Sequence, residues 1–522
     1  MKHIADFLVI LALFVSSACV SSPEQAKAPV SSNKTITLLF TNDIESAYDP
    51  TEAFWLEDLD YIGGVAELST LIRQYRQSEP NAFLFDSGDI FTGALAKLTR
   101  GQLSFELMIS MDYDAMAIGN HEFEYGEQIL AWEKNRVPFP VLGANLFYTG
   151  TRQPFAQPHA VIERNGVRIG VVGAMGQDAA TAIIPSYIDD LFVEDLQQAV
   201  QRSVDELRDE VDLIVVLTHQ GKTAPMQTDA ESDPRLFRGI DADIALAGAV
   251  KGIDVIFGGH SDAGTPDPFV HPETGTIIMQ TYGQATHLGY LQLDYDTDSN
   301  QITSHRGELI PVASSALTPD PIVRDKIQAY RDAYPALQEV VGQTEQILFR
   351  RYIEESALGH LIADIFRETA DADIGLIHSG GIRKDIPAGA IRREDVLDTY
   401  PFVDNLIKVE LSGRQLRAAI EQSLTLERGL LQVSGLSIEY DLERPEGDRA
   451  VSIRLDDVDL SDDMRLSVAV AGFLAEGGDR CFRKAKSSEI SAKSPTRFWS
   501  TSELLGQSHS RAWGARCQLS RL

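Results

Sequence analysis

The sequence predicts an α/β protein in which a large layered domain precedes a smaller second domain. Three observations support this prediction. The chain has 522 residues, which at about 100–200 residues per domain suggests two or three domains. From residue 35 onward, short apolar stretches alternate with amphipathic helical stretches, as in layered α/β folds. A segment rich in Pro, Ser, Ala and Thr then interrupts this alternation, and we interpret residues 311–343 as a helical linker.

The N-terminal segment MKHIADFLVILALFVSSACVSS is typical of a secretory signal. A lysine precedes a compact apolar run at residues 7–15, which is too short to span a bilayer. We assign residues 1–18 to a signal peptide and residues 19–33, rich in Ser, Pro and Ala, to a flexible tether. Cys19 resembles the acylated cysteine of bacterial lipoproteins, although Ser16 stands where such signals usually carry Leu. A lipid anchor at Cys19 and export without an anchor both remain open, and both predict the periplasm or the cell envelope.

The first domain, predicted over residues 34–310, repeats one local plan. TITLLF is strand-like, VAELSTLIRQYR places Val65, Leu68 and Leu71 on one helical face, and NAFLFDSGD returns to a strand. DAMAIGNHEFEYG, DLIVVLTHQG and DVIFGGHSD each indicate a short apolar strand followed by a polar loop. Because ligands of layered α/β folds bind at the loops that follow the strands, these loops form the candidate site.

Side chains with oxygen or nitrogen donors gather in five of these loops. Alternate side chains of an extended stretch face the same way, so we expect Asp43 and Glu45 to bind one cation together. After Cys19 only Cys481 and Cys517 remain, too few for a cysteine-rich zinc site. Two divalent cations about 3.5–4 Å apart would suit the remaining donors and could clamp a phosphoryl group. The candidate residues are Asp43 and Glu45; Asp86 and Asp89; Asn120, His121, Glu122 and Glu124; His219; and His260 and Asp262.

The charge balance narrows the set of partners. The formal net charge is −31, which repels nucleic-acid polymers and anionic membranes. A site that handles phosphates in such a chain needs a local cationic group, and metal ions would serve. No obligate protein partner is evident, so the predicted partner is a small-molecule substrate.

The motifs FTNDIES, DSGDIFTG, GNHEFEYG, THQG and GGHSD, in that order, resemble the binuclear metallophosphatase domain of the secreted bacterial 5′-nucleotidase family. UDP-sugar hydrolases and 2′,3′-cyclic nucleotide phosphodiesterases belong to the same family. The resemblance spans about residues 36–480. It implies a four-layer, calcineurin-like metallophosphoesterase sandwich, followed by an α/β 5′-nucleotidase C-terminal substrate-binding domain at residues 344–480.

The resemblance also implies roles for individual residues. His121 falls on the residue that stabilises the transition state and the leaving group, and Glu124 is its acidic partner. Asp89 falls on the carboxylate that bridges two metals. One metal would be held by Asp43, Glu45, Asp89 and Asp262, and the other by Asp89, Asn120, His219 and His260.

Three residues depart from the family pattern. Glu45 stands where the family usually has His, Asp262 where it has Gln, Asn or His, and Glu124 where it has Asp. The first metal site would therefore hold four carboxylates and no nitrogen, which favours a hard ion such as Mn²⁺ or Mg²⁺ over Zn²⁺. The predicted cofactors are two divalent ions, Mn²⁺, Mg²⁺ or Zn²⁺, with a hard ion at the first site.

The second domain resembles the family in its substrate loop but not in every contact. IHSGGIRKDIPAGAI is similar to the family's NGGGIR loop, and in LLQVSGLSIEYD a leucine, Leu430, replaces an aromatic residue that would stack on the base. A family arginine falls on Arg351 or on its neighbour Arg350. The implied substrate-binding residues are Arg351, His378, Gly380, Gly381, Arg383, Phe473 and Asp479. After them, residues 481–522 form an atypical basic tail, which is either disordered or the product of a changed reading frame.

These observations predict an exported, metal-dependent phosphoesterase of nucleotide catabolism. A 5′-nucleotidase-type hydrolase would act by in-line attack of hydroxide on phosphorus with two metals. A 2′,3′-cyclic nucleotide phosphodiesterase and a nucleotide-sugar pyrophosphatase are the enzymatic alternatives. A non-catalytic surface protein that binds nucleotides or metals is the alternative of another class.

Overall fold

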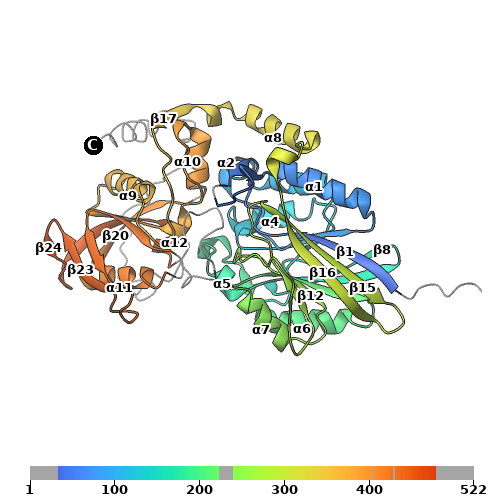
Figure 1. Cartoon of the computed structure of the whole chain (residues 1–522). Helices are drawn as coiled ribbons and strands as arrows, with labels where there is room; N and C mark the ends of the chain where they lie inside the picture. The colour runs from blue at the N-terminus through green and yellow to red at the C-terminus, as the bar shows by residue number, and fades with distance from the viewer. Residues whose placement is uncertain (1–32, 54, 223–238, 403, 427–428, 478–522) are drawn as a thin grey trace, which may run out of the picture.

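The computed structural model describes residues 33–53, 55–222, 239–402, 404–426 and 429–477. The predicted signal peptide, the tether with Cys19, Asp479 and the basic tail at 481–522 lie outside the described residues, except for Asn33 at the end of the tether. Within the described part of the chain, no helix is both long enough and apolar enough to cross a membrane. Figure 1 shows a layered domain with a smaller domain beside it.

Two six-stranded sheets pack face to face in the first domain. The strands of the first sheet are β1 (Asn33–Thr41), β4 (Phe83–Asp86), β5 (Ala115–Ala117), β6 (Val141–Leu142), β15 (His287–Asp296) and β16 (Gln301–Pro311). Those of the second are β8 (His159–Arg164), β9 (Val167–Met175), β11 (Leu213–His219), β12 (Val255–Phe257), β13 (Phe269–Val270) and β14 (Ile277–Met279). Their orders are β16-β15-β1-β4-β5-β6 and β13-β14-β12-β11-β9-β8. Between the sheets the rings of Phe40 and Phe257 stack 4.1 Å apart, within a core that both sheets share.

Helices cover the outer face of each sheet, which completes four layers (Figure 1). The helices α1 (Val65–Ser78), α2 (Gly93–Thr99), α3 (Gln102–Met111), α4 (Glu127–Glu133) and α8 (Pro321–Ala333) contribute to the core over the first sheet. The helices α6 (Leu196–Leu207) and α7 (Asp241–Ala249) cover the second sheet. In α1, Val65, Leu68 and Leu71 are buried, as their helical spacing predicted. The predicted four-layer sandwich is therefore confirmed.

The linker helix α8 packs on the first domain. Asp320 accepts a hydrogen bond from the Ile322 amide at 2.9 Å and so caps the N-terminus of the helix, where Pro321 is well tolerated. Val323 and Ile327 are buried in the core over the first sheet. Near the C-terminus of α8, Arg331 forms ion pairs with residues of both domains, Asp49 and Glu394.

The second domain is built on a four-stranded sheet in the order β20-β25-β18-β21. These strands are β18 (Ile374–His378), β20 (Leu406–Ser412), β21 (Leu431–Ser434) and β25 (Arg465–Ala471). The helix α9 (Ala357–Thr369) packs on one face, and α11 (Gly413–Ser423) packs on the other with β22 (Ser437–Tyr440), β23 (Ala450–Leu455) and β24 (Val458–Asp459). The other α-helices and strands of this domain are β17 (Val340–Thr344), β19 (Gly389–Arg392), α10 (Arg393–Thr399) and α12 (Gly472–Ala475). Those of the first domain are β2 (Pro50–Glu52), β3 (Tyr61–Gly63), β7 (Leu146–Tyr148), β10 (Leu191–Val193) and α5 (Gln177–Ala180).

Candidate metal centre and substrate cavity

A cavity between the two domains brings most of the predicted site residues together. The first domain contributes the loops after β1, β4, β5 and β12, and the second contributes the loops after β18 and α10. The predicted residues that line it are Asp43, Glu45, Asp89, Asn120, His121, Glu124, His260, Asp262, Arg351, His378, Gly380, Arg383 and Phe473. His219 lies directly behind Asp89, and Gly381 does not line the cavity. Arg350, the alternative to Arg351, also lines it.

The backbone at the predicted ligands is left-handed, not extended. Five of the seven have positive φ: Asp43 (49°), Glu45 (46°), Asp89 (60°), His260 (74°) and Asp262 (51°). Strand β1 ends at Thr41, so the expectation that Asp43 and Glu45 continue an extended stretch is wrong. Left-handed backbone costs a non-glycine residue about 1–3 kcal/mol and clusters at functional sites. These residues reach one centre because the chain turns sharply after each strand.

A buried glutamate that we assigned no role organises the loop of Asp89. The Glu122 carboxylate accepts hydrogen bonds from the amides of Gly119 at 2.7 Å, Ile90 at 2.8 Å and Asp89 at 2.9 Å. Gly119 must be a glycine, because a Cβ there would lie 2.2 Å from the Asp89 Oδ1 atom. The two loops thus hold each other with the Asp89 carboxylate turned into the cavity.

His219 presents one defined nitrogen to this carboxylate. Its Nδ1 donates to the carbonyl oxygen of Ser87 at 2.8 Å, which fixes the tautomer. Its Nε2 lies 2.9 Å from Asp89 Oδ2 and 3.2 Å from Asn120 Oδ1. A histidine whose second nitrogen is held by a backbone carbonyl is the usual arrangement of a metal ligand.

The donor set fits a pair of divalent cations. The described residues contain two groups of converging atoms, Asp89 with His219 and His260, and Glu45 with Asp89 and His121, and the atoms of each group lie within 4.8 Å of one another. Asp89 belongs to both groups. Asp262 Oδ1 is buried and has no hydrogen-bond partner among the described residues.

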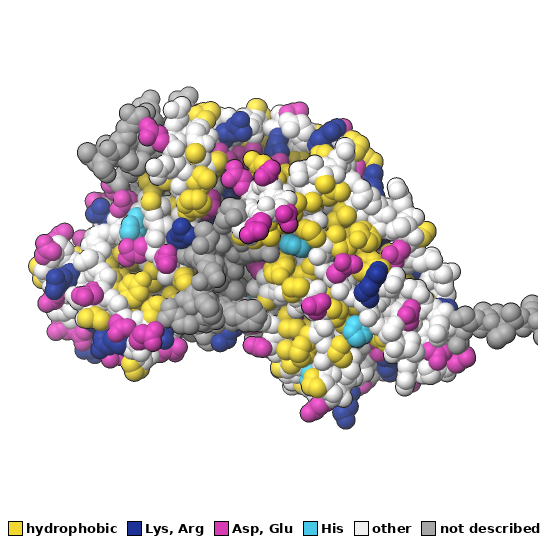
Figure 2. Space-filling model, viewed as in Figure 1, with side chains coloured by type: hydrophobic (Ala, Val, Ile, Leu, Met, Phe, Trp, Pro, Cys, Tyr) yellow, Lys and Arg dark blue, Asp and Glu magenta, His cyan; other side chains and the backbone are white. Residues whose placement is uncertain are grey.

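The electrostatics of the centre also favour bound cations. Burial, together with neighbouring carboxylates, raises the pKa of Asp43 to about 7 and raises the pKa of Asp262. Both shifts mean that the buried carboxylates are short of positive charge, which divalent ions with oxygen ligands would supply. Figure 2 shows acidic side chains, with basic ones among them, spread over both domains on the face drawn.

His121 and Glu124 form a dyad beside the carboxylates. The His121 Nδ1 lies 2.5 Å from Glu124 Oε1, which also accepts a hydrogen bond from the Thr92 hydroxyl at 2.8 Å. Its Nε2 faces the cavity, 3.4 Å from Glu45 Oε1 and 3.8 Å from Asp89 Oδ2. Burial alone would lower the pKa of His121, but Asp89 and Glu124 raise it to about 9. The two carboxylates thus favour the protonated form of the ring.

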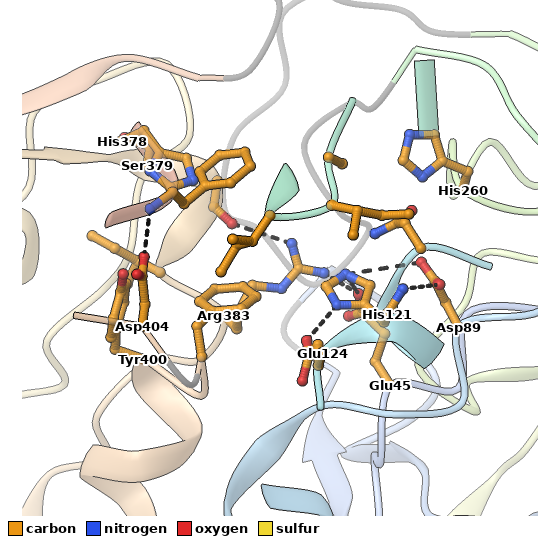
Figure 3. A pocket seen from close by; sticks show the side chains of 18 of the residues that line it. Glu45, Asp89, His121, Glu124, His260, His378, Ser379, Arg383, Tyr400 and Asp404 are labelled. Carbon is orange, nitrogen blue, oxygen red and sulfur yellow. Dashed lines mark hydrogen bonds and ion pairs between the residues drawn. The ribbon is translucent and has the colours of Figure 1, made fainter. Parts of the chain in front are cut away.

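Arg383 connects the second domain to this centre. Its guanidinium forms an ion pair with Glu45, and its Nη1 donates to the carbonyl oxygen of Gly380 at 3.2 Å. Figure 3 shows Arg383 between His378 on one side and the dyad of His121 and Glu124 on the other. Arg350 is buried and contacts the carbonyl oxygen of Arg383.

The far end of the cavity is aromatic. The rings of His378 and Phe473 lie 5.4 Å apart at 38°, and the Phe473 amide donates to Asp404 Oδ2 at 2.9 Å. Leu430 is buried in the core of the second domain and does not line the cavity. The expectation that this position has lost its stacking side chain remains a prediction.

Sequence reasoning missed part of the cavity wall. The additional lining residues include Tyr187, Ile183 and Ile184 of the first domain and Tyr400, Phe402 and Asp404 of the second. For the residues of the second domain, the available sequence signal is the segment TYPFVD, which follows a helical stretch. In this segment aromatic residues alternate with turn-forming ones. Such a segment resembles ordinary core sequence, so spacing alone did not identify it.

Comparisons with known proteins agree with this geometry. Residues 36–262 match the family described as "Calcineurin-like phosphoesterase", and residues 340–487 match "5'-nucleotidase, C-terminal domain". The chain is 30% identical to the 5′-nucleotidase of Homo sapiens over 508 residues, covering 85% of this chain and 83% of that protein. It is 27% identical to the 5′-nucleotidase of Vibrio parahaemolyticus, covering 89% of this chain and 87% of that protein.

A solved structure extends the comparison to the fold. The 5′-nucleotidase precursor of Thermus thermophilus superposes with a TM-score of 0.78 at 27% identity, covering 94% of this chain and 97% of that chain. Calcineurin-like metallophosphoesterases use a pair of divalent metal ions, and the candidate ligand groups described above match that requirement. The chain therefore belongs to the 5′-nucleotidase family and is a metallophosphoesterase hydrolase of that type.

Proposed function

We propose that the protein is an exported enzyme that hydrolyses nucleoside monophosphates, with residues 34–310 as the catalytic domain and residues 344–480 as the substrate-binding domain. The ion pair of Arg383 with Glu45 carries this proposal. It joins the aromatic end of the cavity to the carboxylate end, so one substrate could place a base near Phe473 and a phosphate among the predicted ligands.

The proposed ligand sets divide the donors between two ions. Asp43, Glu45 and Asp262 would bind the first ion, Asn120, His219 and His260 the second, and Asp89 both. The presence of Asp89 in both converging groups supports the bridging role. Because Glu45 offers a carboxylate where the family usually has His, and Asp262 one where it has Gln, Asn or His, we propose Mn²⁺ or Mg²⁺ for the first site.

When bound, the metal pair supplies positive charge to the phosphoryl oxygens and lowers the pKa of water. The protein's own groups would donate the proton and position the substrate. His121, held at Nδ1 by Glu124, donates a proton from Nε2 to the leaving oxygen. Arg383 exchanges Glu45 for the substrate and orients it, while Phe473 offers one face to the base.

Export and anchoring rest on residues 1–33. We propose secretion directed by residues 1–18, with Cys19 either acylated or simply part of the tether. Fractionation of cells that express the full chain, alongside a Cys19→Ser variant, separates the two alternatives. An anchored protein becomes soluble in the variant, whereas a soluble protein stays soluble.

A substrate panel tests the proposed activity. Nucleoside monophosphates, 2′,3′-cyclic nucleotides and nucleotide sugars are each supplied to metal-depleted protein with Mn²⁺, Mg²⁺ or Zn²⁺. We expect the highest kcat/KM for a nucleoside monophosphate, activity only with metal, and full loss with chelator. Preference for a cyclic nucleotide or a nucleotide sugar would assign one of the alternatives, and nucleotide binding without turnover would assign a binding protein.

A further inference from the structure

A buried lysine joins the two domains beside the dyad. Lys97 lies in α2 of the first domain and is 6% exposed. Its Nζ donates to the carbonyl oxygen of Phe402 in the second domain at 2.8 Å. No carboxylate of the described residues lies within 4.0 Å of this ammonium. Burial lowers the pKa of Lys97 to about 8, so the charge is costly to keep there. An apolar side chain would avoid that cost, which indicates that the polar end of Lys97 has a use.

The residue that Lys97 holds packs on His121. The ring of Phe402 lies 6.1 Å from the imidazole, with an interplanar angle of 22°. Phe402 also meets Tyr400 edge-on at 5.5 Å, and Tyr400 meets Phe366 in the core of the second domain at 5.9 Å. The imidazole is thus held at Nδ1 by Glu124 and flanked by a ring that belongs to the other domain.

The same loop also leads to the aromatic end of the cavity. Two residues beyond Phe402, the Asp404 carboxylate accepts hydrogen bonds from the amides of Asn405 at 2.7 Å and Phe473 at 2.9 Å. The charges of Glu124 and Asp404 both favour the protonated form of Lys97. One short loop therefore links the proposed base-stacking residue, the flank of His121 and the lysine of α2.

A second contact shows that α2 is a docking element for the other domain. At its N-terminus, the Ala94 amide donates to Asp398 Oδ1 of α10 at 2.8 Å. Asp398 Oδ2 is in turn 3.1 Å from Lys384 Nζ. The helix α2 is thus held at one end by α10 and near the other end by the loop that follows α10, and among the described residues of α2 the side chain that donates to Phe402 is that of Lys97.

We propose that Lys97 is a positioning residue: by holding the Phe402 backbone it fixes the Phe402 ring against His121, so that the imidazole is oriented for proton donation only when the two domains are docked. This inference rests on the proposed function, because it assigns Lys97 to the step in which His121 protonates the leaving oxygen. That step matters for a nucleoside, whose alkoxide is a poor leaving group. It matters little for p-nitrophenol, which leaves without a proton.

Kinetics on the full-length protein with Mn²⁺ test the inference. Lys97→Met and Phe402→Leu should each lower kcat for AMP about tenfold, with KM within about threefold and p-nitrophenyl phosphate turnover within about twofold. The double variant should lose no more than the worse single variant, because both changes break one linkage. Lys97→Arg, which keeps a donor, should recover most of the AMP turnover. Equal losses on both substrates, or losses that multiply in the double variant, would overturn the proposal.

A matched control and a second measurement separate this inference from the proposed activity. Lys326 also donates to a carbonyl oxygen of a neighbouring helix, that of Glu106 at 3.3 Å, but lies outside the cavity, so Lys326→Met should leave both activities unchanged. Hydrogen–deuterium exchange needs no substrate, and peptides from α10 through Phe402 should exchange about tenfold faster in Lys97→Met but not in Lys326→Met or Lys97→Arg. Unchanged exchange in Lys97→Met overturns the anchoring. Faster exchange in a protein that hydrolyses no nucleotide with any metal supports the anchoring and refutes the proposed function instead.

Discussion

The two halves of the cavity hold their side chains in different ways. In the first domain, five of the seven predicted ligands have left-handed backbone, and Asp43, Asp89 and His219 are at most 2% exposed. In the second domain, none of the described substrate-binding candidates has positive φ, the two glycines included. The side chains of His378, Arg383 and Phe473 are only partly buried. The metal half is therefore built from strained turns that fix donor positions, whereas the recognition half uses side chains on ordinary backbone.

This difference indicates which half tolerates change. A strained turn persists only when the surrounding hydrogen bonds determine it, as Glu122 does for the loop of Asp89. A side chain on ordinary backbone can be exchanged at the cost of its own contacts alone. We expect substitutions in the metal half to abolish chemistry and substitutions in the recognition half to change the choice of substrate.

The largest expected effect is that of Asp89→Asn. The variant keeps the shape of the side chain but removes the charge that both converging groups share. Loss of several kcal/mol of metal and charge stabilisation should lower kcat/KM at least about 10³-fold on every phosphate ester. Steady-state kinetics and metal analysis of the purified protein measure this.

Asp254→Asn is the control for that prediction. Asp254 is a partly buried carboxylate paired with Arg208 at 2.8 Å, away from the cavity. Its substitution should lower stability but leave kcat/KM within about threefold. An Asp89→Asn protein with normal activity would contradict the difference between the two halves.

Arg383→Ala should have the next largest effect, and a selective one. Loss of a charged contact that positions the substrate should lower kcat/KM for AMP about 10- to 100-fold, while p-nitrophenyl phosphate, which needs only the metal half, is barely affected. Arg367→Ala, on the second domain but outside the cavity, should affect neither substrate. Equal losses of the Arg383 variant on both substrates would mean that the second domain does not recognise the nucleoside.

The sequence predicted the positions of the donors better than their geometry. The loops after β1, β4, β5, β11 and β12 followed from the motifs, because a strand followed by polar residues is a local pattern. The left-handed turn at Asp43 and Glu45 did not follow, because residues two apart can converge from either backbone conformation. The pairing of Glu45 with Arg383 depends on how two domains dock, which spacing within either domain does not encode. The burial of Lys97 has no local sequence signal, since the residue of the second domain that it contacts lies about 300 residues away in the sequence.

Glu45→His should change the choice of metal more than the rate. The substitution replaces an oxygen donor with a nitrogen donor, so Zn²⁺ should gain relative to Mn²⁺ by about tenfold in apparent affinity. It also removes the partner of Arg383, so the effect reaches across the two halves. Metal titration of the depleted protein by calorimetry measures both affinities, and an unchanged ratio would exclude Glu45 as a ligand.

The smallest expected effect concerns pH and the Lys97 contact. The pKa of Lys97 is about 8 in the folded protein and ordinary, near 10.5, in the unfolded chain. Above pH 8 the unfolded state binds more protons at this residue, so its contribution to the free energy of unfolding rises with pH. The free energy of unfolding of Lys97→Met, minus that of wild type, should therefore be about 1 kcal/mol lower at pH 9 than at pH 7. Denaturant unfolding at both pH values measures this, and a difference independent of pH would contradict it.

The pairing of β1 with β15 has a consequence for how the chain is made. Residue 33 pairs with residue 296, so the first strand of the catalytic domain cannot complete its sheet until some 260 further residues have been synthesised. Contacts between such distant segments make folding slow, because a long loop must close before any contact rewards it. The first sheet of a nascent chain therefore stays incomplete until residue 296 has been synthesised, and an incomplete sheet is compatible with the export that we propose.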